Sequence, residues 1–261
     1  MFNNNLIALK ATDSHVTIEP TDIDPKPDSR DMDGAEAAAQ RVADALRERI
    51  LSGQMPSGTA LREAALSGSL DVSRNTLREA LRELASEGLV EQQLYKGARV
   101  RAMTADDVRD IFVVRRALQF RAVEQSAYAT QDRLDTLVAL LDTANRAADD
   151  ENWLLVGTAS LRFHHGIVAL IGSRRLDRFF EVIMAQLSLA LADARSDRNF
   201  QSHWIPANRE IADHLLAGRR KEAALVLSDF IDESERLVLD IVRNSWARRS
   251  IDPRSWRLPR Q

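Results

Sequence analysis

Several features that define large protein classes are missing from this sequence. It has no cysteine, which excludes a disulfide framework and any metal site made of thiolates. It has no apolar run of the length that a transmembrane helix needs, and residues 1–34 lack the basic start and apolar stretch of a secretory signal. We therefore expect a cytoplasmic protein with no membrane partner.

An excess of charge of one sign is also missing. The 261 residues carry a net charge of -3, and residues 35–101 contain ten Lys and Arg against nine Asp and Glu. Any nucleic-acid contact must therefore come from the local placement of basic side chains rather than from bulk charge. The hydrophobic content of 44% and the charged content of 29% are typical of a soluble globular protein, and the length suffices for two domains.

Composition and periodicity divide the chain into four parts, and they predict a mainly α fold. Residues 1–34 are acidic and contain three prolines, which indicates a mobile leader. Residues 35–102 combine helical spacing with a hairpin pattern, whereas residues 103–249 show helical spacing only. Residues 250–261 are expected to form an unpacked tail.

In the first folded part, apolar spacing and turn residues predict three helices and a β-hairpin. The helices are expected over 35–52, 62–70 and from Ser73 onward, and the strands over 90–93 and 98–101, with the bend at Gly97. This order is the outline of a winged helix-turn-helix.

The helix after Ser73 combines a buried stripe with a basic, exposed beginning. Leu77, Leu81 and Leu84 recur at helical spacing and predict the packed face. Arg74 and Arg78 fall on the other face, near the end whose N–H groups attract anions. Such a helix suits the major groove of DNA, where Arg reads guanine or holds phosphate. The alternative is an ordinary surface helix.

Residues 36–101 resemble the GntR family of transcriptional regulators. The shared motifs are Pro56-Ser57-Gly58, Leu61, Val72-Ser73-Arg74, Arg78-Glu79-Ala80-Leu81, Leu84, Glu87-Gly88-Leu89-Val90 and Gly97. The sequence departs from the family pattern by inserting Ser57 and by placing Ala64-Ala65 where some relatives have a DNA-contacting arginine. The resemblance implies that Ser73, Arg74, Asn75, Thr76 and Arg78 face DNA, and that Lys96 and Gly97 approach it from the wing. Alternatively, Ser73 only caps its helix and Lys96 is a solvated loop charge.

From Thr104 onward the sequence predicts an antiparallel bundle of six helices. Their expected spans are 105–129, 131–149, 152–171, 173–196, 206–217 and 219–248. This part resembles the FCD domain, the ligand-binding domain of the FadR-like branch of the GntR family. The residues that carry this looser resemblance are Val108, Ile111, Phe112, Arg115, Leu118, Phe163-His164, Ile211, Leu215-Leu216, Gly218 and Ala223.

Three polar side chains lie on apolar stripes of these helices. Arg115, His164 and Asn208 are each spaced so that they point into the bundle. Burying them without partners is costly, so together they indicate a polar cavity that binds a ligand. The alternative is a core network in which the polar groups satisfy one another.

The resemblance also implies a divalent metal, which many FCD domains hold with an Asp and three His. The corresponding positions here are Ser160, His164, Asn208 and Phe230, and this donor set suits zinc or its neighbours poorly. We therefore expect no metal or other cofactor. Arg115 becomes the candidate for holding an anionic effector, an organic acid or an acyl thioester. The expected effector-binding residues are Arg115, Ser160, His164, Asn208 and Phe230.

The resulting hypothesis is a ligand-responsive regulator that binds an inverted-repeat DNA operator as a homodimer. Two alternatives stay open. One is a metal-assisted hydrolase using His164 and His165, although the sequence offers no partnered nucleophile, so we predict no catalytic residues. The other is a dimeric regulator whose bundle binds no ligand.

Overall fold

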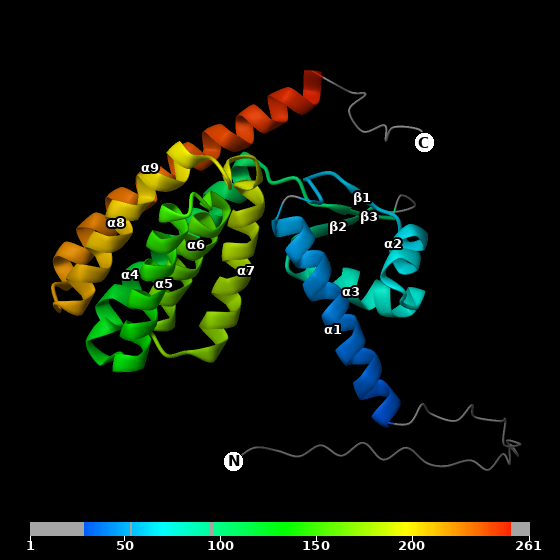
Figure 1. The fold of residues 1–261 in the computed structure, drawn as a ribbon, viewed down its shortest axis with the longest axis horizontal. Coiled ribbons are helices and arrows are strands. Elements are labelled where there is room, and N and C mark those ends of the chain that lie inside the picture. Colours follow the sequence, from blue (N-terminus) through cyan, green and yellow to red (C-terminus); the bar gives the residue numbers. More distant parts are fainter. Residues whose placement is uncertain (1–28, 53, 94–96, 252–261) are drawn as a thin grey trace, which may run out of the picture.

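The computed structural model describes residues 29–52, 54–93 and 97–251. Most of the predicted leader, the end of the predicted tail and Lys96 lie outside these residues. The described chain forms a small head of helices and strands and a larger helical bundle, as predicted (Figure 1). None of the described helices is both long enough and apolar enough to cross a membrane.

The head is built on three helices. They are α1 (Ser29–Leu51), α2 (Glu63–Leu70) and α3 (Arg74–Ser86). The predicted stripe on α3 is buried and packs against α1, whose Leu46 and Ile50 are buried as well. Burial of each such leucine contributes about 1.5–3 kcal/mol to folding.

A three-stranded antiparallel sheet completes the head. Its strands are β1 (Ala60–Leu61), β2 (Val90–Gln93) and β3 (Gly97–Val100), in the order β1-β3-β2. The hairpin of β2 and β3 is the predicted wing. Gly97 lies opposite Gln93 at its end, with φ of +83°. The sequence did not predict β1, because a two-residue strand has no alternation to detect.

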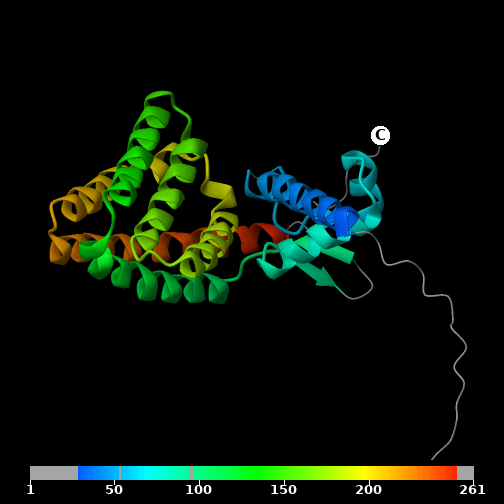
Figure 2. The ribbon, with the colours of Figure 1, turned by 90° about the horizontal axis from the view of Figure 1, so that it is seen from below.

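The second part is an all-helical bundle. Its helices are α4 (Ala105–Gln125), α5 (Gln131–Asp149), α6 (Trp153–Ala169), α7 (Arg174–Ala190), α8 (Arg198–Leu216) and α9 (Arg220–Ile251), with short 3-10 turns at Ser126–Tyr128 and Ala192–Ala194. The predicted capping box at the start of α4 is present, since Thr104 and Asp107 each bind the other's backbone N–H. The long α9 runs along the bundle (Figure 2).

The predicted start of one bundle helix was wrong. We expected a helix from residue 206, but α8 begins at Arg198, where the Asp197 side chain accepts a hydrogen bond from the backbone N–H of Phe200. Pro206 therefore lies inside the helix, although proline removes one hydrogen bond there. Burial of Gln201 and Trp204 on the preceding turns explains why the helix starts early, because tertiary packing overrides local preference.

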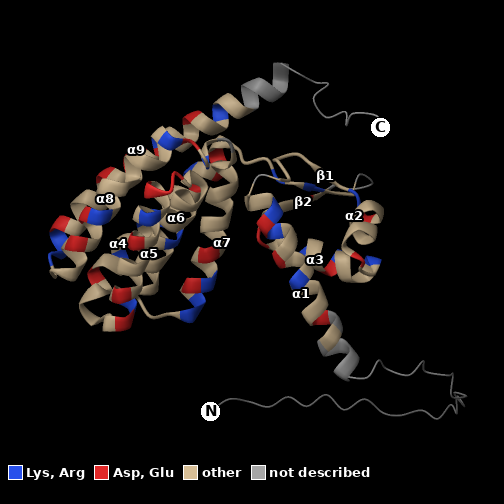
Figure 3. Cartoon of the chain, in the orientation of Figure 1, with Lys and Arg blue, Asp and Glu red and all other residues tan. Residues whose placement is uncertain are grey.

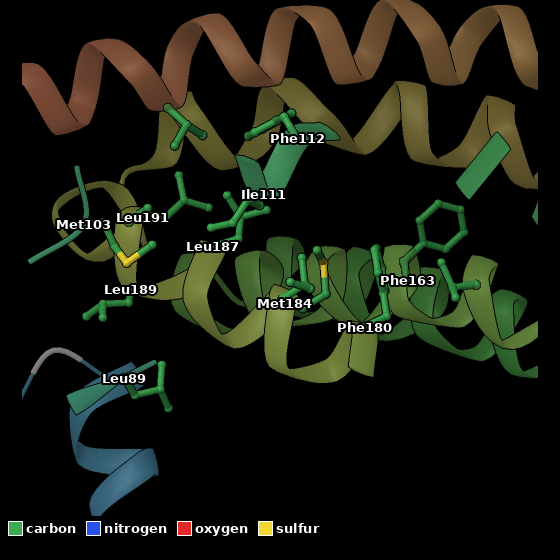
Figure 4. Packing of buried hydrophobic residues seen from close by; sticks show 14 of the residues in the cluster. Leu89, Met103, Ile111, Phe112, Phe163, Phe180, Met184, Leu187, Leu189 and Leu191 are labelled. Atoms are coloured by element: carbon green, nitrogen blue, oxygen red, sulfur yellow. The ribbon is translucent and has the colours of Figure 1, made fainter. Parts of the chain in front are cut away.

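The head lies at one end of the bundle, beside α7 (Figures 1 and 2). Buried apolar residues of the two parts belong to one cluster, which includes Leu89 of the head, Met103 of the connection and Leu189 of α7 (Figure 4). Because the apolar cluster is continuous, a shift of α7 can be transmitted to the head.

Candidate nucleic-acid interface and ligand cavity

The start of α3 is organised by Ser73. Its backbone is extended, and its Oγ accepts a hydrogen bond from the backbone N–H of Thr76 at 3.1 Å and lies 2.8 Å from Thr76 Oγ1. Ser73 is therefore a helix cap, which is the structural role that we considered for it. The cap remains exposed, so it is also free to meet a phosphate.

The basic side chains of α3 project from the surface. Arg74, Asn75 and Arg78 are all exposed, whereas Leu77 between them is fully buried. Arg78 Nε donates to Glu63 Oε2 at 2.8 Å, which holds its guanidinium against the start of α2. Such exposed ion pairs contribute little stability, so exchanging Glu63 for a DNA group costs little.

A surface hollow of about 300 Å³ separates α3 from the wing. Arg78 and Arg82 line it from α3, and Gly97 lines it from β3. Arg82 forms an ion pair with Glu79. Gly97 is exposed, and a Cβ there would have open space around it. Lys96, the other wing residue that we proposed, lies outside the described residues. Basic and acidic residues are interspersed over the described helices, as the balanced charge predicts (Figure 3).

Most of the predicted effector residues meet in one place inside the bundle. Arg115, Ser160, His164 and Phe230 line a cavity of about 30 Å³. Asn208 lines an adjoining hollow that shares Ser160, and its Nδ2 donates to Ser160 Oγ at 2.9 Å. The sequence therefore predicted where the cavity lies, because Arg115, His164 and Asn208 each interrupt an apolar stripe of a helix. It missed other lining residues, including Arg195, Gln201 and Ser234.

Arg115 is fully buried and has weak polar partners. Its Nε donates to Gln119 Oε1 at 3.4 Å and its Nη1 donates to Ser234 Oγ at 3.3 Å, and no carboxylate of the described residues forms an ion pair with it. The guanidinium carbon lies 4.7 Å from the Phe112 ring centre and 5.8 Å from that of Phe230. Burial, and then the charge of Arg116, lower the pKa of Arg115 to about 9, against the opposing effect of Glu235. Arg115 is therefore charged at neutral pH.

Gln119 fixes the tautomer of His164. Because its Oε1 accepts from Arg115, its Nε2 faces His164 Nδ1 and donates to it at 2.8 Å. Burial lowers the pKa of His164 well below its ordinary value, and Arg115 lowers it further, whereas Asn208 acts in the opposite direction. The imidazole is therefore neutral, and its proton lies on Nε2, a buried atom with no hydrogen-bond partner. Nε2 is thus a donor without a hydrogen bond, and the Asn208 side chain, whose Oδ1 is also buried without a partner, lies near enough to raise the pKa of His164.

The same arrangement fits a metal poorly. A metal-bound histidine needs a lone pair on the binding nitrogen and usually donates from the other nitrogen, but here Nδ1 of His164 accepts and Nε2 carries the proton. Ser160 and Asn208 bind each other, and Phe230 has no donor atom. Among the residues that the structure describes, no three His, Asp or Glu side chains gather in a way that could hold a metal ion.

His165 does not join His164 in a shared site. Its Nε2 lies 3.0 Å from the backbone oxygen of Asp177, and its ring stacks on Phe180. The hydrolase alternative required both histidines to act together, and this geometry gives it no support.

Two family models match the chain in succession. The model described as "Bacterial regulatory proteins, gntR family" matches residues 38–100, and the FCD domain matches residues 110–233. A sequence relative from Paenarthrobacter nicotinovorans, named a probable D-xylose utilization operon transcriptional repressor, is 28% identical over 184 residues, which cover 69% of this chain and 79% of the relative.

Solved structures agree with these matches. A GntR transcriptional regulator from Rhodococcus sp. RHA1 superimposes with a TM-score of 0.73 at 30% identity, covering 78% of this chain and 98% of that one. Escherichia coli McbR/YncC has the same fold, with a TM-score of 0.67 at 18% identity. The winged head, the FCD bundle and these relatives show that the chain belongs to the GntR family and is a DNA-binding transcriptional regulator.

Proposed function

We propose that this regulator binds an inverted-repeat operator as a homodimer and responds to a small anionic effector held in the bundle cavity. The observation that carries the proposal is the buried, charged Arg115, which has no carboxylate partner among the described residues and lines the same cavity as His164, whose Nε2–H is unpaired. A buried cation without a counter-charge is costly, and an anionic ligand would remove that cost.

In this proposal, Ser73, Arg74, Asn75, Thr76 and Arg78 contact DNA from α3, and Lys96 and Gly97 contact it from the wing. The exposure of Arg74 and Arg78 at the N-terminal end of a capped helix supports this role. A two-fold dimer would place two such helices on two half-sites, which is why the operator is expected to be an inverted repeat. Acting on operator DNA, the protein would work in the cytoplasm.

The cavity favours one of the two effector classes that we considered. Its volume of about 30 Å³ is close to that of one water molecule, so an effector can enter only when the cavity widens, and a small organic acid requires less widening than a bulky acyl thioester. We further propose that the effector binds without a metal, because the proton on His164 Nε2 and the donor set around it oppose metal binding. Elemental analysis of protein purified without chelators tests this, since stoichiometric zinc would contradict it.

DNA binding is tested by fluorescence anisotropy with a duplex from the protein's own promoter region and a scrambled duplex of the same length. We expect wild type to prefer the promoter duplex, and Arg78→Ala to weaken that binding by about tenfold or more, the effect of losing one base or phosphate contact. Arg109→Ala removes an exposed arginine from the bundle and serves as the control. Equal affinity of wild type for both duplexes at moderate salt would refute sequence-specific binding.

Light scattering tests the homodimer, and thermal-shift screening with organic acids tests the effector. A bound effector raises the unfolding temperature, whereas a bundle that serves only as a dimer scaffold would not respond to any acid.

A further inference from the structure

A second arginine lines the bundle cavity. Arg195 follows the 3-10 turn Ala192–Ala194, and its Nη2 donates to Thr158 Oγ1 at 3.4 Å. Its Nη1 is buried and has no hydrogen-bond partner. Burial lowers the pKa of Arg195, and no acidic neighbour raises it again. Arg195 thus resembles Arg115, because neither guanidinium forms an ion pair with a carboxylate of the described residues.

The charges around the cavity do not balance. Two arginines line it, and no Asp or Glu is among the described residues that do so. Two carboxylates near these arginines have other partners. Glu235 binds Arg116 at 2.7 Å, and Asp197 caps α8. The cavity therefore holds two positive charges, neither of which forms an ion pair with a carboxylate of the described residues, although the charge of Glu235 acts on Arg115.

Hydrogen-bond donors without acceptors also occur around the cavity. His164 Nε2 and Arg195 Nη1 are both buried donors without acceptors, and both belong to residues that line the cavity. A structure that serves only to pack its core would pair such groups, because each unpaired buried donor costs about 1–3 kcal/mol. Asn208 Oδ1, in the adjoining hollow, is a buried acceptor without a partner. Two unpaired donors that line one small space favour a ligand with acceptor oxygens.

We infer that the effector is a small dianion, with one negative group bound by Arg115 and His164 and the second bound by Arg195. This inference rests on the proposed function and narrows it, since a monocarboxylate would leave one arginine uncompensated. Two negative charges on a few heavy atoms occur in short dicarboxylates and in small phosphate monoesters. Both classes carry acceptor oxygens that match the planar fork of arginine.

Isothermal titration calorimetry on the full-length chain tests the inference. The probes are matched by chain length, with succinate against butyrate and glutarate against pentanoate, and glycerol phosphate represents the phosphate monoesters. We expect at least one dianion to bind ten times or more tighter than the monoanions, because it gains a second charge-assisted pairing. Comparing the dicarboxylates with glycerol phosphate then identifies the class.

Arg195→Gln removes the second charge and keeps a polar side chain of similar shape. We expect it to weaken dianion binding about tenfold or more and to change monoanion binding less than twofold. Arg198→Gln is the matched control, because Arg198 is exposed, pairs with Glu151 and does not line the cavity. Circular dichroism melting curves check that both variants fold.

The outcomes separate the two claims. If monoanions bind as tightly as dianions, or if Arg195→Gln leaves the dianion affinity unchanged, the second charge is refuted while the proposed anionic effector survives. If no anion of either class binds wild type, both the dianion and the proposed effector site are refuted, although operator binding by α3 is unaffected.

Discussion

Gln186 of α7 donates a hydrogen bond from Nε2 to the backbone oxygen of Glu87, at 2.7 Å. Glu87 is the C-terminal cap of α3, the helix that presents Arg74 and Arg78. The residue after Gln186, Leu187, lines the bundle cavity. One turn of α7 therefore contacts both the cavity and the end of the DNA-facing helix, and it offers a direct path by which a ligand could reorient the head.

We predict that Gln186→Ala weakens this coupling. The variant removes a side chain that does not line the cavity, so effector affinity by calorimetry should be unchanged. The change in operator affinity caused by the effector should shrink about fivefold, which corresponds to the roughly 1 kcal/mol of one hydrogen bond. Anisotropy titrations with and without the tightest-binding acid measure it. An unchanged effector response would show that α7 transmits the signal by other contacts.

Gly88 lies at the same junction, and a side chain there would have to displace the ends of Gln186 and Arg101. Its φ is +69°, and a Cβ there would lie 2.7 Å from Gln186 Nε2 and 3.1 Å from Arg101 Nη1. We predict that Gly88→Ala destabilises the protein by about 1–2 kcal/mol, since backbone strain adds to the loss of the Gln186 contact. Urea denaturation measures the change.

Two other glycines serve as controls for this prediction. Gly97→Ala shares the positive φ but meets nothing within 4 Å, so it should cost about 1 kcal/mol from strain alone. Gly68→Ala lies within α2 with open space around it, and it should stabilise the protein by about 0.5–1 kcal/mol. A Gly88→Ala effect no larger than that of Gly97→Ala would mean that Gln186 moves aside freely.

Arg47 of α1 holds the end of α3 from the other side. Its Nε donates to Glu87 Oε2 at 2.9 Å and its Nη2 to Glu83 Oε1 at 3.0 Å. Hydrogen bonding to Glu87 raises the pKa of Arg47 despite its partial burial. Arg47→Met should therefore destabilise the protein by about 1–3 kcal/mol, because Glu87 loses its arginine and Glu83 keeps only the hydrogen bond from Gln40. Arg82→Met breaks only an exposed pair and should cost less than about 0.5 kcal/mol in the same denaturation assay. Equal losses of stability in the two variants would show that the hydrogen bonds of Arg47 to Glu83 and Glu87 add nothing to the free energy of unfolding.

The sequence predicted those parts of the molecule in which one side chain departs from a regular pattern. The stripe of Leu77, Leu81 and Leu84 identified α3 and its exposed arginines, and Arg115 and His164 stood out because they interrupt apolar stripes. Periodicity predicted a helix up to residue 196, whereas α7 ends at Ala190 and Arg195 follows a 3-10 turn, so it could not show that Arg195 lines the cavity. It also could not pair Gln186 with Glu87, which lie 99 residues apart in the sequence. Such contacts follow from how the elements pack, which depends on the whole chain.

The buried neutral state of His164 predicts a specific loss of stability in acid. Because burial lowers the pKa of His164 below its ordinary value of 6.5, the unfolded chain takes up this proton at a pH where the folded chain does not. The contribution of His164 to the free energy of unfolding is therefore at its maximum above about pH 6.5. It falls as the pH drops below this value, by at most about 1.4 kcal/mol per pH unit. We expect wild type to lose up to about 2 kcal/mol more than His164→Gln between pH 6.5 and 5.0. Urea denaturation across this range measures the difference, in which contributions common to both proteins cancel. Parallel curves for the two proteins would mean that His164 is protonated as readily in the folded chain as in the unfolded one, and its Nε2 would then no longer be the donor of a neutral imidazole.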